Sequence, residues 1–182
     1  MSAPTTEIPG YVAGTWQIDP VHSEVGYSLK HLGLARSRGR FLAFSGQVVT
    51  GESILDSSVT AEIDAASVST GVTPRDEHIR TAEYFDVANH PKITFRSTGI
   101  RREGEDYFID GELTWRGVTK PVSLTAEFNG VGPNPANDNA TTLGVSAEAT
   151  IARRDFGIGP EGNGFLGEKV KITLEIEAAL QA

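Results

Sequence analysis

Apolar and polar residues alternate along most of this chain, and this period of two constrains the fold more than any other feature. In the last run, residues 168–180, Val170, Ile172 and Leu174 share one parity, whereas Lys171 and Thr173 share the other. Because successive side chains of a β-strand point to opposite faces, each such run predicts a strand with one buried face. We therefore expect an all-β protein.

Similar runs occur at residues 22–32, 58–64, 92–97, 106–115, 121–128 and 143–151, and less regular ones at 14–19 and 41–50. Together they predict about eight or nine strands. Strands with one polar face are typical of antiparallel sheets. So many strands must curl into a barrel or stack as a sandwich, and only a closed barrel leaves no exposed edges. We predict a closed, antiparallel, up-and-down barrel.

The length of 182 residues suits one domain of this kind. Residues 1–13 are polar and contain Pro and Gly, so we expect a flexible tail before a single barrel domain at 14–182. Only Thr73–Phe85 has the features of a helix, with Thr73 as a candidate cap and Pro74 in the first turn. One short helix should therefore lie beside the barrel.

The charge of the chain restricts its partners. Lys and Arg number 16 against 24 Asp and Glu, a net charge of −8, which disfavours binding to nucleic acids and adsorption to anionic lipid surfaces. The sequence starts without a basic, apolar leader, and no stretch approaches the ~20 apolar residues of a membrane span. We expect no nucleic-acid partner, no stable membrane insertion and a cytoplasmic location, or a periplasmic or secreted one if a leader has been removed.

Common catalytic motifs are not found in the sequence. Residues 157–162 match GxGxxG, but Pro160 and Gly162 prevent the helix that a dinucleotide site needs. No GxSxG nucleophile motif occurs, the four histidines are not at metal-ligand spacing, and the chain has no cysteine. We predict a non-catalytic protein with no metal site and no required cofactor.

Two polar residues share the parity of the expected inward faces. His31 follows Tyr27 and Leu29, and Arg153 follows Ile151. A buried imidazole or guanidinium needs hydrogen-bond partners. The pattern favours a buried, hydrogen-bonded His31 and a structural ion pair for Arg153, over a contact to a ligand head group. The candidate partners of Arg153 are Asp155, Asp76 and Glu77.

Several inward positions carry small side chains: Val59, Ala61, Val145, Ala147 and Ala149. An eight-stranded barrel lined by large residues fills itself, whereas small residues leave room for one elongated apolar ligand. Aromatic residues from neighbouring strands could also fill that space. The pattern leaves both possibilities open.

Four segments, in order along the chain, resemble the YceI-like family of polyisoprenoid-binding, lipocalin-like proteins. They are TWQIDPVHSEVGYSLKHLGLARSRGRFLAFSG, TPRDEHIRTAEYFDVANHPKITFRST, DGELTWRGVTKPVSL and ARRDFGIG, and they span about residues 14–160. Several separate motifs in the same order make the resemblance specific. It falls on His22, Ser23, Tyr27, His31, Phe41, Phe44, Gly46, Asp76, His78, Phe85, Asp86, Pro91, Phe95, Ser97, Gly117, Pro121, Arg153, Asp155, Phe156 and Gly157.

The resemblance implies an eight-stranded antiparallel barrel with a helix over one end and an elongated internal pocket. The implied ligand is a long isoprenoid, a prenylated quinone or a fatty amide, bound without catalysis. Tyr27 stands where such proteins commonly have Phe, so its hydroxyl lies in or near the pocket and needs a partner.

Parity and resemblance together predict the ligand-binding residues. The apolar set is Tyr27, Phe41, Phe44, Ile63, Phe95, Leu113, Trp115, Val145 and Ala147, with Phe85 on the helix side and Phe156 beside the final turn. His31 and Arg153 are the polar candidates at the mouth.

Two alternatives stay open at this point. One is a filled barrel that acts through its surface, for example as a stress-related interaction protein, with one contiguous exposed apolar patch. The other is an enzyme acting on a lipid, with His31 as acid–base and Tyr27 or Arg153 assisting. A homodimer through the barrel or the helix face is compatible with each of these functions.

Overall fold

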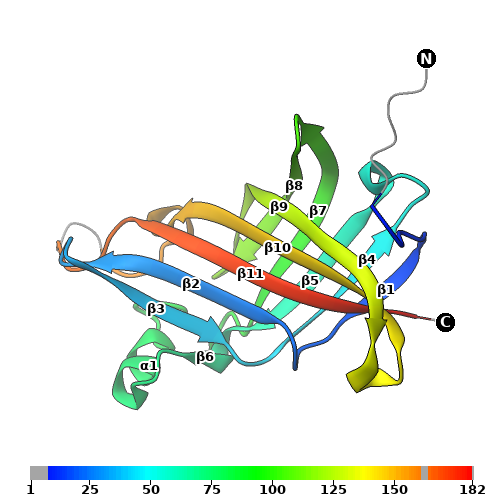
Figure 1. The fold of residues 1–182 in the computed structure, drawn as a ribbon. Helices are drawn as coiled ribbons and strands as arrows, with labels where there is room; N and C mark the ends of the chain where they lie inside the picture. The colour runs from blue at the N-terminus through cyan, green and yellow to red at the C-terminus, as the bar shows by residue number, and fades with distance from the viewer. Residues whose placement is uncertain (1–7, 161–163, 182) are drawn as a thin grey trace.

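The computed structural model describes residues 8–160 and 164–181 (Figure 1). Its strands are β1 (Gly14–Ile18), β2 (Glu24–His31), β3 (Ala35–Phe41), β4 (Phe44–Thr50), β5 (Ser58–Asp64), β6 (Val68–Ser69), β7 (Lys92–Glu103), β8 (Asp106–Trp115), β9 (Val118–Asn134), β10 (Ala140–Ala152) and β11 (Lys169–Leu180). The helices are α1 (Thr73–Ile79) and the 3₁₀ turns η1 (Ile54–Asp56), η2 (Ala65–Ser67), η3 (Pro135–Asn137) and η4 (Arg153–Phe156).

The strands form one closed antiparallel barrel. The order β1-β4-β5-β7-β8-β9-β10-β11 returns to its start, because β11 also pairs with β1. Trp16 of β1 lies opposite Leu180 of β11 at the point of closure. The predicted eight-stranded up-and-down barrel is therefore confirmed.

The remaining strands lengthen the barrel at one end. β2 continues β1 after a bend at residues 19–23, and β11 pairs with β2 through its first half and with β1 through its last residues. In the same way β3 precedes β4, and β6 follows β5. The strands β2 and β3 project together in Figure 1, beside α1.

The barrel wall is interrupted at this end. β6 pairs with β3 only through Val68 and Ser69, and β7 pairs with β5 rather than with β6. Helix α1 and the turns after it cover the interruption. The Arg80 guanidinium, at the end of α1, donates to the carbonyls of Ala66 and Val68 and so fixes the helix beside the interrupted wall.

The opposite end of the barrel is closed by Trp16, whose side chain is 0% exposed. Its indole N–H donates to Thr50 Oγ1 at 2.8 Å, and that hydroxyl donates to the carbonyl of Val12 at 2.8 Å. Leu143 and Ala178 pack around the indole. This end therefore combines dry packing with satisfied polar groups.

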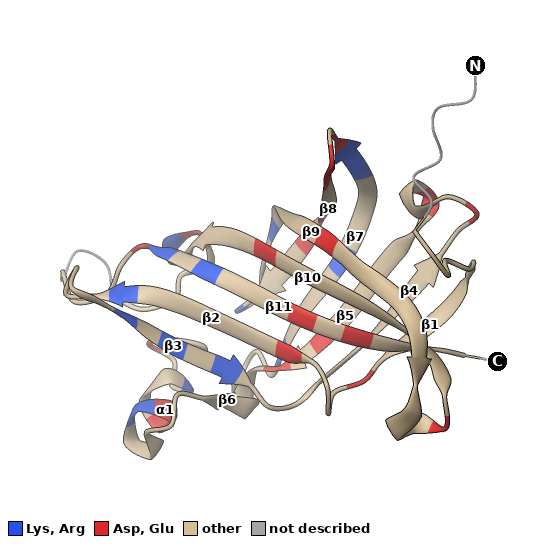
Figure 2. Cartoon of the chain, viewed as in Figure 1, with Lys and Arg blue, Asp and Glu red and all other residues tan. Residues whose placement is uncertain are grey.

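Charge is unevenly distributed along the barrel (Figure 2). Lys and Arg gather on β3 and on the neighbouring ends of β2 and β11, near the interrupted wall, whereas Glu24, Glu175 and Glu177 lie farther along β2 and β11. The net charge of −8 thus conceals a basic region at one end.

Several sequence expectations are corrected by the structure. The helix ends at Ile79 rather than at Phe85, because the turns that follow bring Phe85 back against the barrel, where it is 5% exposed. Its N-cap is Val72, with no side-chain cap, so Thr73 is the first helical residue. Residues 1–7 of the expected tail lie outside the described residues, and Tyr11 donates a hydrogen bond to the Gly51 carbonyl, which holds the rest of the tail against the barrel.

The sequence pattern did not predict β3, because it indicated a single strand over residues 41–50, which in the structure holds only the last residue of β3 and the whole of β4. Residues 35–40 read ARSRGR, so they show no apolar face. The inward positions are instead small, and Gly39 lies opposite Tyr27. A Cβ at residue 39 would clash with the Tyr27 ring, so the large ring of one strand requires the glycine of the next.

Candidate functional site

Two neighbouring cavities occupy the barrel and its interrupted end. The first, which we call the mouth pocket, has a volume of ≈ 490 Å³ and lies between the β2–β3 hairpin, α1 and the segment after β10. The second, the interior cavity, has a volume of ≈ 130 Å³ and lies within the barrel. Tyr27 and Trp115 line both cavities, so the two meet at these side chains.

The interior cavity has an apolar lining drawn from most strands of the barrel. It includes nine of the predicted ligand-binding residues: Tyr27, Phe41, Phe44, Ile63, Phe95, Leu113, Trp115, Val145 and Ala147. Their parity places them inward because each lies on a strand with one buried face. The small inward residues Val59 and Ala61 also border this cavity.

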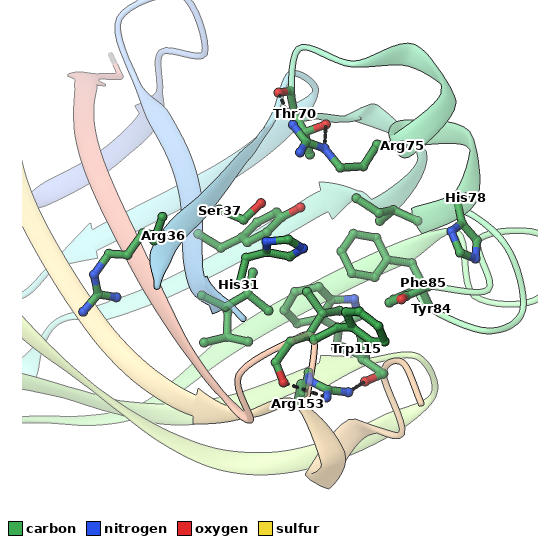
Figure 3. Close-up of a pocket in the computed structure, with 18 residues that line it drawn as sticks. His31, Arg36, Ser37, Thr70, Arg75, His78, Tyr84, Phe85, Trp115 and Arg153 are labelled. Carbon is green, nitrogen blue, oxygen red and sulfur yellow. Dashed lines mark hydrogen bonds between the residues drawn. The ribbon is translucent and has the colours of Figure 1, made fainter. Parts of the chain in front are cut away.

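Aromatic rings separate the interior cavity from the mouth pocket. Phe41 stacks on Phe85 with ring centroids 5.9 Å apart, and Trp115 lies 5.0 Å from Phe85. Tyr27 contacts both Phe41 and Phe85, at 6.0 and 6.4 Å. Figure 3 shows Phe85 and Trp115 facing the mouth pocket. The rings therefore form a wall between the two cavities. A ligand chain that passes from one cavity to the other has to displace these side chains.

Two polar groups in this wall have no hydrogen-bond partner among the described residues. One is the indole N–H of Trp115, whose side chain is buried, and the other is the phenol of Tyr27. Burial raises the pKa of the Tyr27 phenol to about 12, with a smaller contribution from the negative charge of Asp76. Both groups are consequently neutral hydrogen-bond donors at physiological pH.

The Arg153 side chain is 2% exposed and serves the structure of the mouth pocket. Its guanidinium donates to the carbonyls of Ile158, Gly167, Pro160 and Leu166. It also forms an ion pair with Glu168, with an N–O distance of 3.0 Å. The structural ion pair was predicted correctly, but the partner is Glu168 rather than Asp155, Asp76 or Glu77, because the loop before β11 folds back over η4.

The His31 prediction is wrong in one respect. The imidazole lines the mouth pocket, yet the residue is exposed rather than buried, and its imidazole forms no hydrogen bond to a described residue. β2 extends beyond the barrel at this point, so the parity that directs Tyr27 inward directs His31 into an open pocket (Figure 3). His31 is thus free to contact a ligand at the mouth.

The two remaining predicted residues lie on either side of the site. Phe85 borders the mouth pocket, as expected for the helix side. Phe156 packs against Trp115, with ring centroids 6.3 Å apart, and lines neither cavity. It supports the wall from behind. The sequence pattern did not indicate several mouth residues, because they come from α1 and from turns and loops outside the alternating strands: Thr70, Arg75, Ile79, Tyr84, Ile158, Phe165 and Leu166.

One cluster of possible metal ligands lies away from the cavities. Donor atoms of Asp19, His22 and Glu177 fall within 4.8 Å of one another. The Asp19 carboxylate accepts from His22 Nδ1 at 2.8 Å and from the Val21 amide at 2.9 Å. The hydrogen bond between Asp19 and His22 lowers the pKa of Asp19 and raises that of His22. These bonds hold the bend between β1 and β2 and explain why the side chains lie together. We call the hydrogen-bonded pair the Asp19–His22 clasp.

A family model described as the YceI-like domain matches residues 16–178. A UPF0312 protein of Pectobacterium carotovorum is 37% identical over 161 residues, which cover 88% of this chain and 82% of that protein. No helix within the described ranges is long and apolar enough to cross a bilayer.

Two solved structures have the same fold. Burkholderia cenocepacia BcnA has a TM-score of 0.78 at 24% identity, covering 89% of this chain and 99% of that one. A polyisoprenoid binding domain from Saccharophagus degradans has a TM-score of 0.68 at 15% identity, covering 93% and 100%. With the family model matched over nearly the whole barrel, the chain belongs to the YceI-like family.

Proposed function

We propose that this protein binds a long-chain isoprenoid, a prenylated quinone or a similar amphiphilic lipid in its barrel, without changing it chemically. The observation that carries the proposal is the pair of cavities, since an apolar interior meets an open mouth pocket at Tyr27 and Trp115. The similarity to a polyisoprenoid binding domain supports the same class of ligand. Transport of the lipid, a cytoplasmic location and a homodimer stay predictions from sequence.

The cavity volumes indicate how a chain would be accommodated. The mouth pocket, at ≈ 490 Å³, falls within the roughly 300–1,000 Å³ of common ligand sites. The interior cavity, at ≈ 130 Å³, is close to the ~150 Å³ of an engineered cavity that binds benzene, and so has room for about one isoprene unit. A longer chain therefore requires the aromatic wall to move. Each CH₂ buried in this lining contributes about 0.8 kcal/mol.

The two unpartnered donors support a ligand that carries oxygen. The Trp115 N–H is buried without a partner among the described residues, which costs about 1–3 kcal/mol. The Tyr27 O–H, on a partly buried side chain, lies beside it where the cavities meet. A quinone carbonyl or a prenol hydroxyl accepts such hydrogen bonds, whereas a pure hydrocarbon does not. These donors favour an amphiphile whose oxygen lies at the passage.

The filled-barrel alternative keeps one specific observation in its favour, the small volume of the interior cavity. Catalysis gains less support from the site. Arg153 is committed to four backbone carbonyls and Glu168, and His31 has no hydrogen bond to another titratable side chain among the described residues. The arrangement therefore favours binding over acid–base chemistry.

Blocking each cavity separately tests the proposal. Ala147→Trp fills the interior, and His31→Trp narrows the mouth from an exposed position that folding does not require. We expect both variants to lose at least about tenfold in geranylgeraniol affinity, measured by native mass spectrometry, since a blocked cavity forfeits several buried CH₂ groups. Val21→Trp, at an exposed site outside both cavities, serves as the control.

Circular dichroism confirms that each variant is folded, and Val145→Phe replaces Ala147→Trp if the larger residue prevents folding. Unchanged affinity in a folded interior variant would show that no chain enters the barrel. The filled-barrel protein would then be the better description.

A further inference from the structure

The end of the barrel that holds the mouth pocket carries exposed apolar side chains. Leu34 is 86% exposed, Phe165 56% and Leu32 47%. The Leu32 amide donates to the Phe165 carbonyl at 2.7 Å, and the Gly167 amide to the Lys30 carbonyl at 2.8 Å. The β2–β3 turn and the loop before β11 are thereby joined into one edge around the pocket. We call this edge the rim.

The turn that presents these leucines is unfavourable for the isolated protein. Leu32 has a φ of +56°, a region that favours glycine and that costs a β-carbon-bearing residue steric energy. The same residue also exposes its apolar side chain to water. A strained backbone that displays apolar groups points to a function, because neither feature stabilises the free molecule.

Unpaired cations begin next to the apolar part of the rim and continue along β3. Lys30, Arg36, Arg38 and Arg40 are exposed, and none forms an ion pair with any residue that the structure describes. Lys30 and Arg36 lie directly opposite each other on neighbouring strands, an arrangement that is destabilising for like charges. Strand β3 contains no acidic residue. The acid of β2, Glu24, lies at the end of the hairpin away from the rim, so the part of the outer face next to the rim has no counter-charge on either strand.

We propose that the rim docks the protein on a bilayer containing anionic lipids, with the mouth pocket facing the membrane. Leucine and phenylalanine side chains enter the interface between head groups and acyl chains, while the arginines contact the lipid phosphates. The net charge of −8 opposes adsorption of the molecule as a whole, but the acids of β2 and β11 lie away from the rim (Figure 2). Charge complementarity at this end therefore selects an anionic membrane surface as the partner.

The docked orientation adds a route by which lipid reaches the barrel. It rests on the proposed function only for the identity of the lipid that is taken up. The mouth pocket is lined by Phe165 and Leu166 of the rim, so a lipid leaving the bilayer would enter beside them. The Arg36 guanidinium points away from the pocket in Figure 3, which leaves it available to the membrane. Docking itself requires no bound isoprenoid.

Vesicle binding tests the proposal without any cargo. The full chain is mixed with vesicles of phosphatidylcholine alone or with added phosphatidylglycerol, both free of isoprenoids, and the bound fraction is measured by flotation. We expect binding to the anionic vesicles, weakening as salt is raised, and little binding to the neutral ones. Equal binding to both vesicles, or binding to neither, would overturn the proposal.

Paired variants locate the surface. Arg36→Gln with Arg38→Gln should weaken binding to anionic vesicles on the order of 25-fold, since each cation near such a surface contributes about fivefold. Arg96→Gln with Arg102→Gln removes the same charge from β7 and should leave binding unchanged. An equal effect of the two pairs would show that only net charge matters and would overturn the rim assignment.

Leu34→Gln distinguishes a bilayer from a soluble polyanion. We expect it to weaken vesicle binding on the order of fivefold, because the leucine enters the interface, whereas Val21→Gln at an 82% exposed site should have no effect. Full binding by Leu34→Gln would contradict insertion of the rim. Vesicle binding without geranylgeraniol uptake would overturn the proposed function alone, and uptake without vesicle binding would overturn the docking alone.

Discussion

The two ends of the barrel use aromatic residues in opposite ways. At the closed end Trp16 is fully buried and its N–H is bonded to Thr50. At the open end Trp115 and Tyr27 also lie within the packing, but neither polar group has a partner among the described residues. The closed end is complete as it stands, whereas the open end has donors that a ligand could satisfy.

The closed end of the barrel therefore serves stability, and the open end serves the proposed binding function. Arg153 satisfies the loop carbonyls around the mouth pocket and so keeps the open end rigid without closing it. The aromatic wall is then the movable part. Substitutions at the closed end should therefore change mainly the free energy of unfolding, whereas substitutions in the aromatic wall should change mainly the affinity for lipid.

Loss of Arg153 should have the largest effect on stability. Arg153→Met removes the donor to four loop carbonyls and to the partly exposed Glu168, and leaving a buried acceptor without its partner costs about 1–3 kcal/mol, so we expect a loss of about 3 kcal/mol or more. Chemical denaturation measures the change in the free energy of unfolding. Arg154→Met, at the exposed neighbouring position, should change it by less than about 0.5 kcal/mol. Equal effects would refute a structural role for Arg153.

Trp16→Phe tests the closed end. It removes the donor to Thr50 and part of the packing, so we expect a loss of about 1–3 kcal/mol in the free energy of unfolding. Lipid affinity should stay the same, because Trp16 lines neither cavity. A variant with unchanged stability and weaker lipid binding would reverse the assignment of the two ends.

Tyr27→Phe makes the matched change at the open end. The hydroxyl has no protein partner among the described residues, so its removal should alter the free energy of unfolding by less than about 1 kcal/mol. Binding of a prenylated quinone should weaken by about three- to tenfold, through loss of one hydrogen bond. A large loss of stability would show instead that the hydroxyl is satisfied within the protein.

The smallest expected effect is the pH dependence of the Asp19–His22 clasp. The hydrogen bond to Asp19 raises the pKa of His22 above 6.5, its value in the unfolded chain. The stabilisation by His22 is therefore complete below pH 6.5 and is lost as pH rises through the raised pKa of the folded protein. The lowered pKa of Asp19 gives the opposite dependence, with stabilisation present above 3.8 and lost as pH falls through its lowered pKa.

Thermal unfolding of the wild type and His22→Gln measures this contribution. The difference in Tm between them should be greatest between about pH 4 and 6.5 and should shrink toward about pH 8. A constant difference across this range would mean that the titration of His22 does not contribute to stability.

The sequence predicted the barrel because its inward faces obey a period of two. The runs ending at Trp115 and Ile151 illustrate this, since most alternate residues of β8 and β10 are buried. The same rule failed at residues 35–40 and at His31, where the strands extend beyond the core and burial no longer follows parity. Partners made by loops, such as Glu168 for Arg153, leave no periodic signal.

The rim illustrates the same limit for charge. A total of −8 describes the whole chain, but the interaction of a surface depends on which charges share one face. Arg36, Arg38 and Arg40 share a parity on β3, and the register that places Lys30 opposite Arg36 becomes visible only in the folded barrel.

Native mass spectrometry of protein purified from its own host, with extraction and identification of what accompanies it, tests the central claim most directly. We predict a stoichiometric bound isoprenoid or prenylated quinone that is released when the protein unfolds. Protein without an adduct, and without uptake of added prenyl chains, would contradict a lipid-binding barrel and would favour a filled barrel that acts through its surface.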